Sequence, residues 1–152
     1  MSYVSRVLQP GEDVRAQAHL HWIIFVPGVL LLILAIIIAI AASGMDNWQL
    51  IVYALAALCG LAALIQLLSA WLTRWSTEMA VTDRRVIYKR GIIWRQTREM
   101  HIDKVESVDV NQSIWGRLLN YGDITFIGTG TGWEPLTRIA DPLDFRSHVT
   151  GI

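Results

Sequence analysis

The side chains that could perform acid–base chemistry or bind a metal form two small groups. His101 and Asp103 lie near Glu106, and one residue separates His19 from His21. Acid–base catalysis needs its groups within hydrogen-bonding reach, which alternation along a strand does not by itself supply. A metal site at the two histidines would need a third ligand, and no Cys or acidic residue stands nearby in the sequence. We therefore expect His101 to end a strand and Asp103 to begin a turn, with no catalytic, cofactor or metal site.

A glycine-rich segment, Gly128-Thr129-Gly130-Thr131-Gly132, raises the possibility of a phosphate-binding loop. Such a loop needs a helix directly after the glycines, because the free N–H groups and dipole of the helix N-terminus hold the phosphate. Here Trp133-Glu134-Pro135 and a strand-like run follow instead. We expect the tip of a flexible hairpin, which could still contact a partner.

A cluster of basic residues could attract an anionic membrane surface. Each basic side chain near such a surface contributes about 1 kcal/mol, within a screening length of about 8–10 Å. Two interpretations stay open: the side chains contact lipid head groups, or they only solvate alternating strand faces. The candidate lipid-facing residues are Arg84, Arg85, Lys89, Arg90, Arg95 and Arg98.

The composition separates these polar residues from a strongly apolar central part. Of 152 residues, 53% are hydrophobic and 17% charged, which is too apolar for an ordinary soluble domain. Between Trp22 and Leu72 the only charged residue is Asp46, so all 13 Lys and Arg lie elsewhere. The formal net charge is zero, so no global field recruits nucleic acid. The single cysteine, Cys59, excludes an intrachain disulfide.

Two segments are long and apolar enough to cross a membrane as helices. Trp22–Ala42 has 21 residues, which span about 31 Å as a helix, and Leu50–Leu72 has 23. The short linker Ser43–Gln49 makes them antiparallel neighbours. Ala39-Ile40-Ala41 resembles a signal-peptide cleavage site, but the apolar run is too long and a second one follows. We expect a two-helix membrane hairpin.

Basic residues predict the orientation of this hairpin. The linker has none, whereas Arg6 and Arg15 precede the first helix and Arg74 and further basic residues follow the second. The positive-inside rule therefore places both termini in the cytoplasm and Asp46 outside. Aromatic residues fit the same orientation as membrane-interface residues: Trp22, Trp71 and Trp75 on the inner side and Trp48 on the outer.

Small residues recur along both helices and would let their backbones approach closely in lipid. Pro27 could kink the first helix. Two polar residues on one face of the second helix suggest hydrogen bonds between helices, within the chain or between copies. The candidate helix-packing residues are Gly28, Ala35, Ala39, Ala56, Gly60, Ala63, Gln66 and Ser69.

After Trp75 the sequence changes from helical to strand-like alternation. Short helices are expected from Ser113 through Leu119 and from Asp141-Pro142 to about Thr150. Consecutive hairpins with a terminal helix predict a bent antiparallel sheet or partial barrel. Whether Val14–Leu20 adds a strand is left open. The expected strands are Glu78–Thr82, Arg84–Lys89, Ile92–Met100, Val105–Asn111, Ile124–Thr129 and Trp133–Ile139.

A series of motifs follows in a distinctive order along the chain: Leu8-Gln9-Pro10-Gly11-Glu12, His21-Trp22, Thr82-Asp83-Arg84-Arg85-Val86-Ile87-Tyr88, Arg90-Gly91-Ile92, Ile102–Val108, Gln112-Ser113 and Gly116–Asp123. In this order they resemble the bacterial PH-like domain of the YdbS type, in its membrane-anchored members. The resemblance implies a pleckstrin-homology-like fold, a bent antiparallel sheet closed by a C-terminal helix, and a bacterial plasma membrane location. It also implies that basic residues of the first hairpins could bind phospholipid. The terminal helix, at about nine residues, is shorter than in a typical PH domain.

The sequence thus predicts a two-helix transmembrane hairpin joined to a mainly β PH-like domain. The expected parts are a cytosolic N-terminal segment (1–21), the hairpin (22–72) and a cytosolic PH-like domain (73–152). We expect a non-enzymatic, membrane-anchored interaction or scaffold module at the cytoplasmic face of the plasma membrane. It would act through a protein partner or self-association in the lipid bilayer, without nucleic acid. The alternatives are a sensor of anionic phospholipid head groups and an accessory subunit of a membrane complex.

Overall fold

The computed structural model of the chain describes residues 3–44, 47–91, 95–129 and 132–151. The chain divides into two units. The β unit combines Met1–His21 with Thr73–Ile152, and the helical hairpin is Trp22–Leu72.

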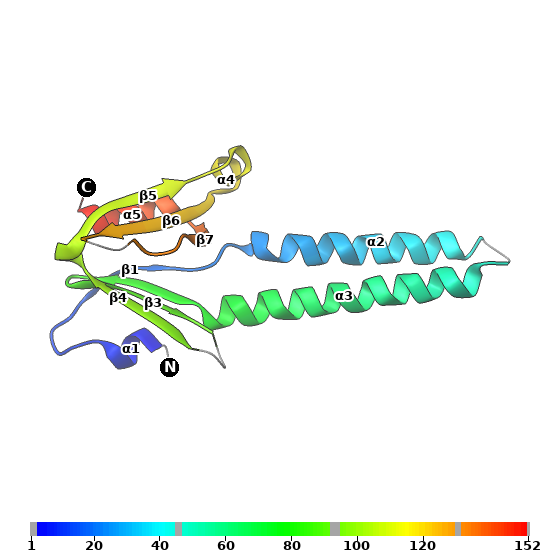
Figure 1. Cartoon of the computed structure of the whole chain (residues 1–152), viewed down its shortest axis with the longest axis horizontal. Coiled ribbons are helices and arrows are strands. Elements are labelled where there is room, and N and C mark those ends of the chain that lie inside the picture. The colour runs from blue at the N-terminus through cyan, green and yellow to red at the C-terminus, as the bar shows by residue number, and fades with distance from the viewer. Residues whose placement is uncertain (1–2, 45–46, 92–94, 130–131, 152) are drawn as a thin grey trace. The chain divides into compact units, whose positions relative to one another are not determined.

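Two apolar helices form the helical hairpin. A 3₁₀ turn, η1 (Trp22–Phe25), leads into α2 (Val26–Ala42), and α3 (Gln49–Ser76) follows (Figure 1). The segments Trp22–Ala42 and Gln49–Ser76 are long and apolar enough to span a membrane, as predicted. Pro27 lies in the first turn of α2, where its missing N–H removes no helical hydrogen bond and a kink is not expected. Asp46, expected at the outer side, lies outside the described residues.

The predicted small residues line the contact between α2 and α3. Gly28 and Ala35 of α2 and Ala56 and Ala63 of α3 are buried. A Cβ atom added at Gly28 would lie 2.8 Å from the Leu67 side chain, so no larger residue fits there without a shift. The backbones therefore approach closely, as small residues permit.

Four further predicted packing positions are less enclosed. Ala39 and Gly60 are half-buried. Gln66 and Ser69 lie on the exposed side of α3, where the Ser69 hydroxyl donates a hydrogen bond of 2.8 Å to the Gln66 carbonyl of the same helix. Their side of α3 is therefore not the one buried in the hairpin, and hydrogen bonding between copies stays a prediction.

The β unit contains two antiparallel sheets. The first has the order β1–β2–β3–β4 and the second the order β5–β6–β7. The two sheets are connected at opposite edges. At one edge, residues 19–21 follow β1 and reach the second sheet through a bridge between Leu20 and Ile139. At the other edge, η2 (Ile102–Lys104) joins β4 to β5. The strands are β1 (Val14–Ala18), β2 (Glu78–Thr82), β3 (Arg85–Arg90), β4 (Gln96–His101), β5 (Val105–Asn111), β6 (Tyr121–Gly128) and β7 (Leu136–Ala140).

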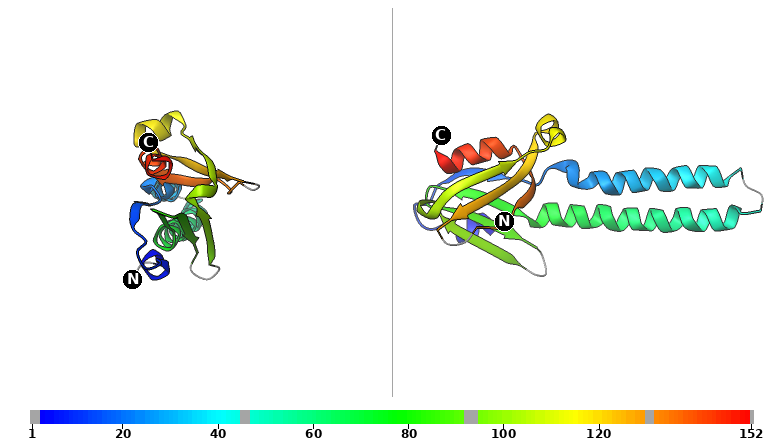
Figure 2. Two further views of the ribbon diagram at one scale, coloured as in Figure 1. Left: turned by 90° about the vertical axis from the view of Figure 1, so that its left-hand side faces the viewer. Right: turned by 45° about the horizontal axis from the view of Figure 1, so that its top comes forward.

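The core of the β unit lies between the two sheets and the C-terminal helix. That helix, α5 (Pro142–Thr150), packs against β1, β5 and β6 (Figure 2). It contributes Phe145 and Val149 to the core. Phe126 and Ile124 of β6 are fully buried beneath it. The predicted antiparallel strands and short C-terminal helix are present, but the strands form two sheets where the sequence predicted one bent sheet or partial barrel.

Most predicted elements agree with the structure within a few residues. β2 and β5 match their predicted ranges, whereas β6 begins earlier, at Tyr121, and β7 begins later, at Leu136. The beginning of the strand expected at Ile92–Met100 lies outside the described residues. Ser113 caps the helix α4 (Ile114–Leu119), since its side chain accepts a hydrogen bond of 3.0 Å from the Gly116 N–H.

Asp141 differs from the helix cap that the sequence predicts. It directly precedes α5, but its φ of 48° is left-handed and its carboxylate makes no cap hydrogen bond. The carboxylate instead accepts a hydrogen bond from the Asn120 side chain. Asp141 therefore ties the start of α5 to the end of α4.

The N-terminal segment 1–21 is part of the β unit rather than a separate segment. The question left open about Val14–Leu20 is answered by β1, which pairs with β2 from Ala18 opposite Met79 to Val14 opposite Thr82. A short helix, α1 (Tyr3–Val7), also contacts β2. The helical hairpin is thus inserted between two paired strands. We call the end of the sheets that holds Ala18 and Glu78 the exit end, because the chain leaves and re-enters the β unit there.

This insertion predicts which parts of the chain fold together. Replacing 22–72 by a short flexible linker should give a folded soluble domain, which we call the linked domain, because His21 and Arg74 lie close enough to interact electrostatically. A chain of 73–152 alone should not fold, because β2 loses its neighbour β1 and the core loses Ala18. Dispersed NMR spectra and cooperative urea unfolding of the linked domain would test this. Equal stability of the 73–152 chain would contradict it.

Candidate functional site

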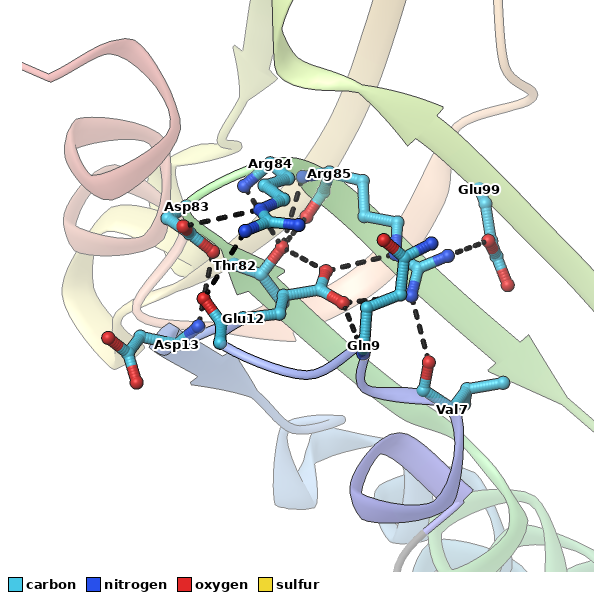
Figure 3. Close-up of polar contacts among 10 residues, drawn as sticks. Val7, Gln9, Glu12, Asp13, Thr82, Asp83, Arg84, Arg85 and Glu99 are labelled. Atoms are coloured by element: carbon cyan, nitrogen blue, oxygen red, sulfur yellow. Dashed lines mark hydrogen bonds and ion pairs between the residues drawn. The ribbon is translucent and has the colours of Figure 1, made fainter.

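A buried carboxylate joins the N-terminal segment to the turn between β2 and β3. The Gln9–Glu12 turn closes on itself, since the Glu12 amide donates to the Gln9 carbonyl at 3.0 Å and the Gln9 amide donates to Glu12 Oε2 at 2.8 Å. Gly11 permits this turn by adopting a φ of 77°. The turn carries the Glu12 side chain, with 0% of its surface exposed, to Thr82 and Arg85 (Figure 3).

Arg85 binds this carboxylate through two nitrogens. Its Nε donates to Glu12 Oε1 and its Nη2 to Glu12 Oε2, both at 2.9 Å, and the Thr82 hydroxyl donates to Oε1 at 2.7 Å. Arg85 also donates to the Val7 carbonyl at 2.8 Å and to Glu99 of β4 at 2.7 Å. One guanidinium therefore connects α1, the Gln9–Glu12 turn, β3 and β4. We call Glu12, Thr82, Arg85 and Glu99 the Glu12 cluster.

The hydrogen bonds of the Glu12 cluster determine the charge of its carboxylate. The hydrogen bond from Arg85, which outweighs the effect of burial, lowers the pKa of Glu12 from 4.5 to about 2. The same contact raises the pKa of Arg85 above its ordinary value. Both groups are therefore charged at neutral pH, and Glu12 is not poised to exchange a proton there.

A cavity of about 250 Å³ lies beside the Glu12 cluster. It is smaller than the pockets that usually hold drug-sized molecules, about 300–1,000 Å³. Two arginines and two aspartates border it, so their charges offset one another. The residues that line it are Gln9, Asp83, Arg84, Arg85, His101 and Asp103.

The predicted chemistry candidates do not come together in one site. His101 ends β4, as predicted, and Asp103 lies in η2; both border the cavity, which Glu106 does not line. His19 is exposed, whereas His21 is buried and stacks on Tyr121, with 5.2 Å between ring centroids. Within 3–44, 47–91, 95–129 and 132–151, no group of three His, Cys, Asp or Glu side chains could hold a metal ion.

The glycine-rich segment belongs to a tight hairpin, as far as it is described. Ile127 and Gly132 form a β-bridge, and the Trp133 amide donates to the Phe126 carbonyl at 2.8 Å. A Cβ atom added at Gly128 would lie 2.7 Å from the Lys104 carbonyl oxygen. The close backbone approach explains Gly128, while Gly130 and Thr131 lie outside the described residues.

The six basic residues lie at different places in the β unit. Arg85 is buried in the Glu12 cluster, so the prediction that it faces lipid is wrong. Lys89 and Arg98 form ion pairs with Glu78 and Glu134. Arg84 is exposed beside Asp83, at the end of β2 and β3 away from the exit end.

Two exposed arginines remain at the exit end. Lys89 lies opposite Glu78, the first residue of β2. Arg90, the last residue of β3, therefore lies near the point where α3 ends and β2 begins. Arg95 directly precedes β4, whose first residue Gln96 lies opposite Arg90. Both side chains are exposed. β3 extends about 17 Å between this end and Arg85, so Arg90 and Arg95 are well separated from Arg84.

The predicted interface aromatics lie at the ends of the apolar helices. Trp22 begins η1, Trp48 precedes α3, and Trp71 and Trp75 lie in the last turns of α3. All four are at least half exposed. Their position at helix ends is the one that aromatic belts occupy in membrane proteins.

The role of Glu12 was missed by sequence reasoning, although its motif was recognised. Two features of the sequence point to this role indirectly. Pro10-Gly11 marks a turn directly before Glu12. Arg85 begins a strand whose next three residues, Val86, Ile87 and Tyr88, are buried. An arginine so placed requires an acidic partner. The sequence does not say which of the acidic residues supplies it.

Comparison with known families shows where the chain belongs. The family model for the bacterial PH domain matches residues 19–151. The chain belongs to the bacterial PH domain family. The match includes both apolar helices and every strand from β2 onward, but begins after β1, so Glu12 lies outside it. No curated protein and no solved structure shows significant similarity to the chain.

The Glu12 cluster predicts unequal effects of two matched substitutions. In the linked domain, Glu12→Gln should lower the free energy of unfolding by about 3 kcal/mol, because it leaves a buried arginine poorly paired. Glu99→Gln, which changes a carboxylate with 37% of its side chain exposed, should cost less than about 1 kcal/mol. Urea unfolding measures both values. Equal losses in the free energy of unfolding would contradict the assignment of Glu12 as the main partner of Arg85.

Acid should remove the contribution of Glu12. Its folded-state pKa lies below the ordinary value, so this stabilisation is present above pH 4.5 and is lost as pH falls toward about 2. The difference in stability between the unsubstituted linked domain and Glu12→Gln should shrink over that range. A difference that is constant from pH 7 to pH 2.5 would contradict the assigned ion pair.

Proposed function

We propose that this bacterial PH domain protein is a membrane-anchored, non-catalytic interaction module. The observation that carries the proposal is the insertion of the helical hairpin between β1 and β2, neighbouring strands of one sheet. His21 directly precedes Trp22, and only Thr77 separates α3 from β2. A domain joined to two membrane helices without a flexible linker stays at the membrane surface. It would act on molecules that reach that surface.

The state of the polar groups supports binding rather than catalysis. The Glu12 carboxylate accepts hydrogen bonds from Arg85, Thr82 and the Gln9 amide and stays ionised at neutral pH. It stabilises the fold in this state and does not supply a proton. PH-like domains are modules that contact proteins or lipids, which supports the same conclusion.

We also propose the finer assignment that the motifs suggest: a YdbS-type, multi-pass protein of a bacterial plasma membrane with both termini in the cytoplasm. Its support is the charge distribution, since Arg6, Arg15 and Arg74 flank the hairpin and the described part of the connection between α2 and α3 carries no basic residue. In this orientation the β unit faces the cytoplasm.

The partner that we propose is a second copy or another membrane protein. Gln66 and Ser69 support this, because they place polar groups on an exposed side of α3 within its long apolar stretch. Interhelical contacts between such groups stabilise helix association in membranes. A scaffold role and an accessory role in a membrane complex both follow from such an interface.

Crosslinking in native membranes, followed by native mass spectrometry in mild detergent, tests the interaction. The intact chain should appear in a complex with at least one further polypeptide. Gln66→Ala with Ser69→Ala should reduce that complex, whereas Leu61→Ala, which shortens another exposed side chain of α3, should not. Recovery of the single chain alone from crosslinked membranes would contradict the proposal.

A second candidate function is contact with anionic lipid head groups. Arg90 and Arg95 favour it, because they are exposed at the exit end, where the chain passes into the membrane helices. Arg84, at the other end of the same strands, serves as a matched control. Each basic residue near an anionic membrane adds about 1 kcal/mol to the free energy of binding. The contribution of the two arginines is therefore large enough to measure.

Binding of the linked domain to anionic vesicles distinguishes the contribution of Arg90 and Arg95 from that of Arg84. Arg90→Gln with Arg95→Gln should weaken binding to anionic vesicles by about 2 kcal/mol, or about thirtyfold, at low salt. Arg84→Gln should leave binding nearly unchanged. If Arg84→Gln weakens binding as much as the pair, the exit end is not the lipid-facing surface.

A further inference from the structure

The short helix α4 presents an apolar surface to the outside of the β unit. Ile114, Trp115 and Leu118 have 85%, 67% and 72% of their surface exposed. Leu118 is a neighbour of Ile114 (i, i+4) and of Trp115 (i, i+3) on the helix surface, so the three side chains form one continuous apolar surface. The opposite face is fixed to the sheet, since a Cβ atom added at Gly116 would lie 2.6 Å from the Tyr121 carbonyl oxygen. The helix therefore cannot turn its apolar face inward.

The position of α4 in the β unit indicates what covers this surface. The His21 ring hydrogen-bonds the Leu119 backbone at the end of α4 and stacks on Tyr121, the next residue but one. His21 is also the last residue before the membrane helix that begins at Trp22. The end of α4 thus contacts the residue at which the chain enters the first membrane helix.

The dimensions of α4 allow it to reach the lipid. Six helical residues extend about 9 Å, and the polar region on each side of a bilayer is about 5–8 Å thick. Tryptophan prefers this region, and leucine and isoleucine enter its border with the acyl chains. Exposed Arg117, within the same helix, would remain with the head groups.

We propose that Ile114, Trp115 and Leu118 insert into the border between head groups and acyl chains of the membrane that the hairpin crosses. The proposal rests on the membrane insertion of the hairpin proposed above. It makes α4 a third, shallow attachment beside the two chain connections at His21 and Thr77. A third attachment would hold the part of the β unit that carries α4 against the membrane surface.

Fluorescence quenching in the full chain tests this proposal. In a Cys59→Ala background, one cysteine is introduced by Leu118→Cys, by Glu106→Cys in β5 or by Leu34→Cys in α2, and labelled with a small fluorophore. The chain is reconstituted into vesicles whose lipids carry bromine either high on the acyl chain, for the labels at 118 and 106, or near the end of the acyl chain, for the label at 34. Iodide in the buffer probes exposure to water.

The three positions give distinct expected results. The label at 118 should be quenched by brominated lipid and protected from iodide, and the label at 106, an exposed site on β5 away from α4, should show the reverse. The label at 34 should be quenched by lipid, which reports insertion of the hairpin itself. This combination supports the proposal.

Each other combination overturns it in a different way. Strong iodide quenching at 118 with lipid quenching at 34 contradicts insertion of α4 but leaves the proposed anchoring intact. Protection of 118 from both quenchers shows that protein, a second copy or another chain, covers α4. Absence of lipid quenching at 34 contradicts membrane insertion and both proposals together.

Discussion

The fold of the β unit depends on the ion pair between Glu12 and Arg85. These residues are separated along the chain by the whole helical hairpin, yet the carboxylate and guanidinium meet through two hydrogen bonds of 2.9 Å. Burying an ion pair does not by itself stabilise a protein, because desolvation offsets the attraction; what costs several kcal/mol is burying one charge without its partner. Arg85 therefore favours the native position of the N-terminal segment, because without Glu12 it would keep only the partly exposed Glu99 as an acidic partner. Any arrangement that leaves β1 unpaired also leaves this arginine without Glu12.

This constraint explains how a domain interrupted by two apolar helices can remain one unit. β1 enters the sheet beside β2, α1 covers part of β2, and segments 19–21 reach the second sheet through Leu20. The Glu12 cluster closes the end of these strands away from the hairpin. The exit end, by contrast, carries the two chain connections, the exposed arginines Arg90 and Arg95, and α4. The β unit thus has one end closed by the Glu12 cluster and another end at which the chain passes into the two apolar helices.

Periodicity and turn residues predicted most of this architecture because they act locally. The long apolar runs predicted both apolar helices, and Ser113 predicted the start of a helix that the structure confirms. What could not be predicted depends on contacts between distant segments. Arg85 was grouped with its basic neighbours, although its pairing with Glu12 removes it from the surface. Asp141 has the residue type of a helix cap, but its contact with Asn120 gives it a different backbone conformation.

A double-mutant cycle in the linked domain tests the central claim most directly. Glu12→Gln, Arg85→Met and the combined variant are unfolded with urea at pH 7, and the three losses in free energy are compared. If the two residues form the pair on which the N-terminal closure depends, the combined loss should be smaller than the sum of the single losses by about 2 kcal/mol. Single losses that add to within about 0.5 kcal/mol would show that the residues act independently and would contradict this account.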